Sequence, residues 1–243
     1  MKYYKVLSGG KSCNGGDYVW DLPTKNSDGT WTPGKWTEKI NGDLIPYKNG
    51  YHICGKNDLV CWLDKEIYEA EYRGEIIRNI DNYTVREVRL LCKIETWNEK
   101  VARLFAADCA ERVLPNYEAQ YPNDKRLRLI VKAARDYANG KITSNELSIV
   151  AAEAQSVVVL AAKLSKQSTG KISAWSAAES AIRTIMQSNI EIAAHSAARL
   201  AAESASESAV PITDWFIGCP ARINAEISER KWQTKRLCEL LGI

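Results

Sequence analysis

Histidine and cysteine are the residue types in this chain best suited to metal binding or nucleophilic chemistry. His52 and His195 are its only histidines, and they lie far apart in the sequence. His52 is followed by Cys54 and then by Cys61, which gives three side chains of the kind that bind zinc. No Cys-x-x-Cys pair accompanies them, so buried free cysteines explain the pattern better than a metal site does. We therefore expect neither a metal nor another cofactor.

The motifs of common catalytic folds are missing from the sequence. The serines between Ser144 and Ser208 lie on expected helix surfaces and form no Gly-x-Ser-x-Gly elbow. The segment Gly9-Gly10-Lys11-Ser12 lacks the earlier glycine and the following helix of a phosphate-binding loop. These observations favour a non-enzymatic protein over an enzyme.

Aromatic side chains are concentrated in the first part of the chain. They could stack on a base or hold a peptide, or they could form the core of a small β-rich module. The set comprises Trp20, Trp31, Trp36, Tyr47, Tyr51 and Trp62. The sequence leaves both interpretations open.

A second set of candidate binding residues is basic and follows residue 124. Lys125, Arg126, Arg128, Lys132 and Arg135 could form a cationic helix face for a phosphate or an acidic partner. A solvated face balanced by nearby carboxylates is the simpler interpretation of such a run.

The composition is that of an ordinary globular protein. Hydrophobic residues make up 45% of the 243 residues, and a net charge of +3 gives no reason to expect nucleic acid as a partner. The seven cysteines form no regular framework, and residues 1–7 lack the apolar core of a signal peptide. No unbroken apolar run approaches the roughly 20 residues of a membrane span. We expect a cytoplasmic protein with free thiols and no membrane segment.

The amino-acid composition changes near residue 96. Ten of the fourteen glycines lie within residues 1–74, whereas alanine dominates residues 102–209. We predict an α+β protein in which a small β-rich module (residues 1–95) packs on an Ala-rich, all-helical domain (residues 96–243). Strands are expected at residues 3–7, 51–54, 66–72 and 83–95. A helical turn is expected at residues 57–63, with Asn57 or Asp58 as its N-cap.

Helices are expected from Thr96 onward. Thr96 and Glu99 fit a capping box, and the helix that they begin should end before Pro115. Asp108 and Arg112 are four residues apart, a spacing at which an ion pair stabilises a helix. Later helices are expected over about 124–139 with Gly140 following, from Thr143 to about 166, from Ser173, from Ser188 to before Pro211, and over about 221–241.

Part of the first module resembles an uncharacterised domain family that is common in phages and prophages. The resemblance is carried by Asn49-Gly50-Tyr51-His52-Ile53-Cys54, by Asp58-Leu59 and Trp62, and by Tyr68-Glu69-Ala70-Glu71-Tyr72. The family's hallmark is a Gly-aromatic-His-x-Cys segment, a short helix and a Glu-x-Glu strand. The resemblance implies a viral or prophage origin and a role at the interface with host defence.

Residues 96–140 resemble the helical domain of a family of immunity proteins, which are so labelled from genomic context. The matching residues run from Ala106 to Pro115 and continue with Tyr117, Tyr121-Pro122, Asp124, Arg126, Ala133-Ala134-Arg135 and Gly140. The two resemblances together cover about residues 1–140.

The order of elements in the first module is also similar to the cores of ADP-ribosyltransferase-like folds. The sequence departs from an active pattern, because the first strand offers only Lys5 and no clear Arg or His to hold a nicotinamide nucleotide. The resemblance therefore implies a pocket for an ADP-ribose-like nucleotide rather than transfer chemistry.

Our leading hypothesis is a phage or prophage binding protein that modulates host defence. It would sequester a nucleotide-type signal or bind a host or phage protein, without catalytic residues. The expected binding residues are His52, Trp62, Glu69, Glu71, Asp108, Arg112, Arg126 and Arg135. Two alternatives remain open: an enzyme that acts on NAD or an ADP-ribose linkage and depends on Glu71, and a structural protein whose helices form a homo-oligomer.

Overall fold

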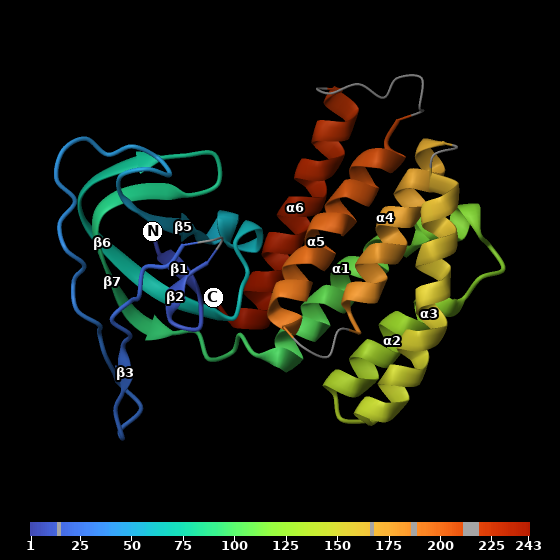
Figure 1. Ribbon diagram of the computed structural model, residues 1–243, viewed down its shortest axis with the longest axis horizontal. Helices are drawn as coiled ribbons and strands as arrows, with labels where there is room; N and C mark the ends of the chain where they lie inside the picture. Colours follow the sequence, from blue (N-terminus) through green and yellow to red (C-terminus); the bar gives the residue numbers. More distant parts are fainter. Residues whose placement is uncertain (14–15, 166–167, 186–188, 211–218) are drawn as a thin grey trace. The chain divides into compact units, whose positions relative to one another are not determined.

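The chain has the predicted α+β class, with strands up to Lys93 and helices from Glu99 onward (Figure 1). The computed structural model describes residues 1–13, 16–165, 168–185, 189–210 and 219–243. It divides into two compact units. The first comprises Met1–Trp97 together with Leu241–Ile243, and the second comprises Asn98–Leu240.

The first unit is built on antiparallel strands that close on themselves. The long strands are β1 (Tyr3–Ser8), β5 (Tyr51–Gly55), β6 (Glu66–Arg78) and β7 (Tyr83–Lys93), and the short β2 (Lys11–Ser12) forms a hairpin with β1. Neighbours follow the order β2-β1-β5-β7-β6, and β1 also pairs with β6. Pairing therefore runs around a ring of four strands, as in a small barrel, and leaves few open sheet edges.

Alternating side chains fill this ring. The buried cluster contains Leu7 of β1, Ile53 of β5, Tyr68 and Ala70 of β6, Val85, Val88 and Leu90 of β7, and Trp20 from the loop after β2. Tyr3 packs against the same cluster. Because successive side chains of a strand point to opposite faces, Lys5 shares the inward face of β1 with Tyr3 and Leu7.

The segment between β2 and β5 lies along the part of β7 that β5 does not pair. Its short strands β3 (Thr24–Lys25) and β4 (Trp31–Thr32) form a hairpin of their own. The backbone amides of Gly34, Thr37 and Ile40 then donate to carbonyl oxygens of Leu90, Val88 and Arg86. These bonds satisfy acceptors of β7 that would otherwise face solvent.

The predicted helical turn is present as the 3-10 helix η1 (Lys56–Cys61), but its predicted cap is wrong. Gly55 occupies the N-cap position, and no side chain caps the helix. The carboxylate of Asp58 binds the guanidinium of Arg78 instead, with both oxygens engaged at 2.6 and 2.9 Å. A bidentate ion pair of this kind is stronger than a neutral cap bond.

The second unit contains six α-helices among the described residues. They are α1 (Glu99–Gln120), α2 (Arg126–Ala138), α3 (Ser144–Leu164), α4 (Thr169–Arg183), α5 (Ile190–Ser208) and α6 (Pro220–Leu241). α1 packs against α2, α4 and α5, and α4 packs against α5. Fully buried alanines recur along α4 (Ala174, Ala177, Ala178, Ala181) and α5 (Ala194, Ala197, Ala198, Ala201). This spacing places one small-residue stripe on each helix, which lets the two axes approach closely.

Long polar side chains, rather than small ones, join α6 to its neighbours. Gln233 donates a 2.8 Å hydrogen bond to the carbonyl oxygen of Ala198 in α5. Arg236 pairs with Asp108 of α1 at 2.7 Å.

Two helix boundaries predicted from sequence are confirmed. Thr143 and Glu146 form a complete capping box at the start of α3. Gly140 follows α2 with φ +70°, the left-handed conformation that a glycine adopts without strain. The predicted boundaries at residues 166 and 188 lie outside the described residues.

The predicted start and end of the first helix are wrong. Asn98 is the N-cap of α1 and accepts from the amide of Val101, whereas the Thr96 hydroxyl donates to the carbonyl of Leu241. The helix also continues through Pro115 to Gln120. Proline removes one backbone bond, but Leu114 and Tyr117 on either side are buried, so their packing offsets that loss.

The predicted start of the fourth helix is also wrong. α4 begins before Ser173, because Ser168 is its N-cap and accepts from the amide of Lys171. Ser173 is instead buried within the helix, and its hydroxyl donates to the carbonyl of Ser204. A serine can start a helix or bond within a packed interior, and the local sequence does not distinguish the two roles.

One described helix passes a length and composition test for a membrane span. α3 reaches a mean hydropathy of 1.6 over 18 residues, of which a quarter are buried. A core helix of a globular protein passes the same test, so this is weak evidence.

Candidate functional site

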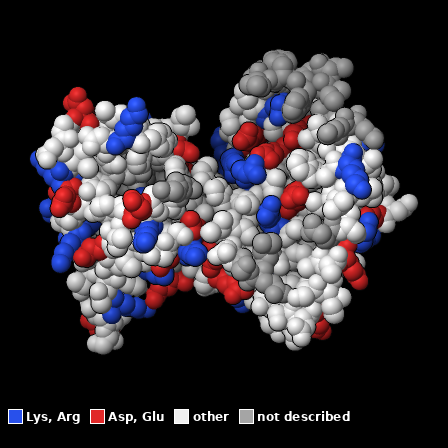
Figure 2. Space-filling view, viewed as in Figure 1, with Lys and Arg blue, Asp and Glu red and all other residues white. Residues whose placement is uncertain are grey.

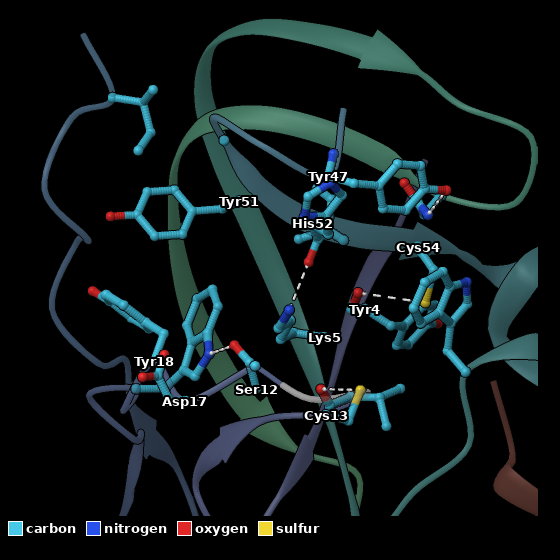
Figure 3. A pocket seen from close by; sticks show the side chains of 18 of the residues that line it. Tyr4, Lys5, Ser12, Cys13, Asp17, Tyr18, Tyr47, Tyr51, His52 and Cys54 are labelled. Atoms are coloured by element: carbon cyan, nitrogen blue, oxygen red, sulfur yellow. Dashed lines mark hydrogen bonds between the residues drawn. The ribbon is translucent and has the colours of Figure 1, made fainter. Parts of the chain in front are cut away.

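A large cavity lies in the first unit, where β1 and β5 separate (Figure 3). The two strands pair only at Tyr3–Gly55 and Tyr4–Cys54, and beyond these pairs the ladder ends. The cavity has a volume of about 920 Å³, within the range of small-molecule sites. Its wall is formed by both strands together with residues 12–13, 16–18, 20 and 47–50.

Lys5 is a buried charged group of this wall, which Asp17 and Lys48 also line. The residue is only 8% exposed, and its ammonium donates a 2.9 Å hydrogen bond to the carbonyl oxygen of His52. The ammonium also lies 4.8 Å from the ring centroid of Trp20. Among the described residues, no carboxylate lies within ion-pair distance of it. Burial lowers the pKa of Lys5, because the charged form has lost water without gaining a negative partner.

His52 lies beside the cavity as a neutral hydrogen-bond acceptor. Its Nε2 accepts a 3.0 Å bond from the backbone amide of Tyr47, which fixes the proton on Nδ1. The Tyr47 ring stacks on the imidazole at a centroid distance of 5.1 Å, and the phenol oxygen of Tyr47 accepts from Asn82. Burial, and then the charge of Lys5, lowers the pKa of His52.

Tyr47 adopts a backbone conformation that few non-glycine residues adopt. Its φ is +61°, in the left-handed region. This conformation directs the amide of Tyr47 to His52 while the ring covers the imidazole. Such strain persists only where surrounding contacts compensate for it, and it is concentrated at binding sites.

A cluster of edge-to-face aromatic rings forms the other side of the cavity. Tyr18, Trp20 and Tyr51 contact one another with centroid distances of 5.2 to 5.8 Å. The indole of Trp20 donates to Ser12, and the hydroxyl of Tyr51 donates to the carbonyl of Glu38, so two of the three rings are held in place. Burial, reinforced by Tyr51, raises the pKa of Tyr18 to about 12. The rings therefore present neutral faces suited to stacking.

The two thiols that line the cavity, Cys13 and Cys54, each form a hydrogen bond to the backbone. Cys13 donates to the carbonyl of Val6, and Cys54 donates to the carbonyl of Tyr4. Burial raises the pKa of both thiols, which keeps them protonated and poorly nucleophilic. Within the part of the chain that the structure describes, no three His, Cys, Asp or Glu side chains are placed to hold a metal ion.

The structure brings two of the predicted binding residues to this cavity. His52 and Trp62 line it, and the Trp62 indole donates to the carbonyl of Asp81. Glu69 and Glu71 of β6 are not among its lining residues. Glu69 pairs with Lys2 at 2.8 Å, and Glu71 pairs with Arg89 of the neighbouring strand.

The other four predicted residues belong to ion pairs of the helical unit. Asp108 lies between Arg135 (2.8 Å) and Arg236 (2.7 Å). Arg112 binds the buried carboxylate of Glu229 at 2.9 Å, and its guanidinium covers the ring of Trp232 at 4.1 Å. Arg126 binds Asp124 at 2.6 Å.

The basic run after residue 124 is balanced by carboxylates. Arg126, Arg128, Lys132 and Arg135 each have an acidic partner within 2.9 Å. On the face seen in Figure 2, Lys and Arg side chains are likewise intermixed with Asp and Glu. Four of the five cations of the run are thus paired within the described chain, and ion pairs at an exposed helix surface contribute little stability.

The sequence analysis named Tyr47 only as one of several aromatics that could stack on a ligand, and it did not include Lys5 among the expected binding residues. A lysine within the otherwise apolar run Tyr3-Tyr4-Lys5-Val6-Leu7 was a usable signal, because it falls on the same face as Tyr3 and Leu7. No sequence signal marks the left-handed conformation of Tyr47, since tyrosine is disfavoured there.

Part of the chain is similar to a known protein family. Residues 93–188 match the model of a family described as "Imm-5 like putative immunity protein". The match covers less than half of the chain, from the end of β7 through α4, and includes the segment for which an immunity-protein resemblance was expected. The chain is thus immunity-protein-like in this region. No curated protein and no solved structure matches it.

Proposed function

We propose that this protein is an immunity-like binding protein whose β-rich unit captures a small anionic ligand that carries a planar ring, such as an ADP-ribose-like nucleotide. Capture of such a signal in the cytoplasm would modulate host defence, in keeping with a phage or prophage origin. The observation that carries the proposal is the buried ammonium of Lys5, which lines a large cavity without a carboxylate partner among the described residues.

The energetic argument concerns the charge on Lys5. A buried cation without an ionic partner destabilises the folded state, and one hydrogen bond to a carbonyl offsets only part of that cost. A phosphate or carboxylate placed beside the ammonium would supply the missing negative charge in a setting of low dielectric constant. An anionic ligand would therefore give the ammonium of Lys5 the ionic partner that it lacks among the described residues.

The aromatic walls support a ring in the same ligand. Tyr18, Trp20 and Tyr51 on one side, and Tyr47 and Trp62 on the other, line one continuous cavity. Stacking of a base on such side chains contributes roughly 1–3 kcal/mol per base. The cavity volume of about 920 Å³ is large enough for a ring and a charged group together.

The geometry supports capture rather than turnover. The acceptor nitrogen of His52 is occupied by the Tyr47 amide, and both nearby thiols have raised pKa values. The carboxylates of Glu69 and Glu71 are held by Lys2 and Arg89. These groups would first have to leave their partners in order to act as a base or nucleophile.

Titration calorimetry tests the proposal with ADP-ribose, NAD, AMP and inorganic phosphate as separate ligands. We expect binding of at least one ring-bearing anion, weaker binding of phosphate alone, and loss of binding in Lys5→Met. Lys2→Met is the matched control, because Lys2 lies near the start of the same strand but is exposed and pairs with Glu69. Absence of binding to the wild-type protein, or equal binding by Lys5→Met, would overturn the proposal.

A further inference from the structure

The helix α3 has one face packed within its unit and an opposite, exposed face, on which Arg126 of α2 donates a 3.1 Å hydrogen bond to the hydroxyl of Ser156. It contacts α2 and α4, and its buried side chains are Leu147, Val157, Val158 and Ala161. The opposite face is exposed although it is partly apolar: Ile149 is 62% exposed, Val159 47% and Leu160 45%. Exposed aliphatic side chains that share one face mark an interaction surface.

The exposed residues form a continuous stripe. Their spacings of three and four residues match the period of an α-helix and of a helix–helix seam. The stripe consists of Glu146, Ile149, Ala152, Glu153, Ser156, Val159, Leu160 and Lys163, all of them exposed. Its centre carries the small residues Ala152 and Ser156 with Glu153 between them.

The stripe is complementary to itself when it is reversed. Glu146 stands at its amino end and Lys163 at its carboxyl end, and neither forms an ion pair with a described residue. In an antiparallel pairing that sets Glu146 opposite Lys163 of a second copy, Ile149 falls opposite Leu160, since each lies three residues further in. A two-fold axis then generates both contacts twice, as in any isologous interface.

We propose that α3 pairs antiparallel with α3 of a second copy of this chain to form a homodimer. Each half of the interface contains one Glu146–Lys163 ion pair and one Ile149–Leu160 contact, and the same register sets Glu153 opposite Ser156 near the two-fold axis. The hollow of about 280 Å³ between α2 and α3 is lined by Glu146 and Glu153, and also by Arg126, Lys132 and Asp136.

Lipid is the competing occupant of this face, and the charges argue against it. Glu153 lies in the middle of the stripe, and Glu146 and Lys163 are also exposed on it. A carboxylate at the centre of a lipid-facing helix is costly.

Sedimentation velocity of the full chain over a range of concentrations tests the dimer. We expect a reversible dimer for the wild-type protein and a monomer for Leu160→Asp, which sets a carboxylate opposite Ile149 in both halves. Lys163→Glu sets like charges opposite each other and should weaken the dimer by roughly tenfold. Adding Glu146→Gln, which preserves the capping box, should recover part of that loss.

Lys231→Glu, an exposed charge reversal on α6, is the matched control and should leave the dimer unchanged. Circular dichroism verifies that each variant is folded. A wild-type monomer at every concentration, or a dimer that survives Leu160→Asp, would overturn the proposal. So would binding of the monomer to phosphatidylcholine–phosphatidylglycerol vesicles in a manner that Leu160→Asp abolishes.

Discussion

The ammonium of Lys5 bridges β1 and β5 by donating a 2.9 Å hydrogen bond to the carbonyl oxygen of His52. The bridge lies just beyond the last backbone pair of the two strands, Tyr4–Cys54. A side chain thus satisfies an acceptor that the interrupted ladder no longer pairs. The cavity opens where the ladder is interrupted. Lys5 therefore has a structural role in joining the two strands and a proposed role in binding the ligand.

These two roles predict opposite effects of replacing Lys5. Lys5→Met removes a buried charge but keeps an unbranched side chain of similar length, so we expect the free energy of unfolding to rise by about 1 kcal/mol. Ligand binding should be lost in the same variant. Urea unfolding measures the first effect, with Lys2→Met as the control. A loss of more than about 1 kcal/mol would show instead that the bond to His52 outweighs the cost of the charge.

Binding of an anion should be accompanied by proton uptake. Burial lowers the pKa of Lys5 in the free protein, and a negative ligand beside it would raise that pKa again. The complex therefore holds more protons than the free protein at any pH between the two values, and affinity falls as the pH rises through that window. Calorimetry in buffers of different ionisation enthalpy measures the uptake. Its absence at every pH tested, from neutral to above the ordinary pKa of lysine, would indicate that Lys5 does not contact the anion.

The sequence predicts the framework of this protein better than its site, for a physical reason. Alternation marks β7 and small-residue periodicity marks the helices, because both patterns arise locally from which face is buried. The cavity depends on where the ladder between β1 and β5 stops, and pairing between residues about 50 apart leaves no local trace. Glu69 and Glu71 illustrate the difference: their strand was predicted, but their ion-pair partners Lys2 and Arg89 come from other parts of the sheet.

His52 should titrate below the ordinary range of histidine. Burial and the charge of Lys5 both lower its pKa, and protonation of Nε2 would break the bond from the Tyr47 amide. We expect the loop around residue 47 to remain closed at neutral pH and to open only in acid. Nuclear magnetic resonance of the imidazole signals measures the midpoint, and His195→Gln assigns them. A midpoint above 6.5 would contradict this account.

Asp124 should contribute stability that is lost in acid. Its hydrogen bonds from Arg126, the backbone amide of Arg126 and Tyr117 lower its pKa from 3.8 to about 2. Because the folded-state pKa is depressed, the contribution is complete above about pH 4 and disappears as the pH falls through about 2. Asp124→Asn should flatten this part of the stability profile in urea unfolding between about pH 2 and 5. Glu191→Gln, on an α5 carboxylate outside this network, serves as the control, and an equal change in both variants would contradict the prediction.

The pair Arg112–Glu229 should show strong energetic coupling. Glu229 has a side chain only 5% exposed, so its carboxylate depends on the guanidinium of Arg112 at 2.9 Å for a charged partner. Arg112→Met leaves that carboxylate buried without its cation and should cost about 3 kcal/mol in the free energy of unfolding.

The double variant Arg112→Met with Glu229→Leu removes both charges together. It should be close to the wild-type protein in stability, since apolar replacement of a buried ion pair is often neutral or stabilising. Arg112→Lys separates the charge from the contact with Trp232, because lysine keeps the first but lacks the planar group that covers the ring. If the two single changes simply add in urea unfolding, the two residues are not coupled, and the join between α1 and α6 depends on other contacts.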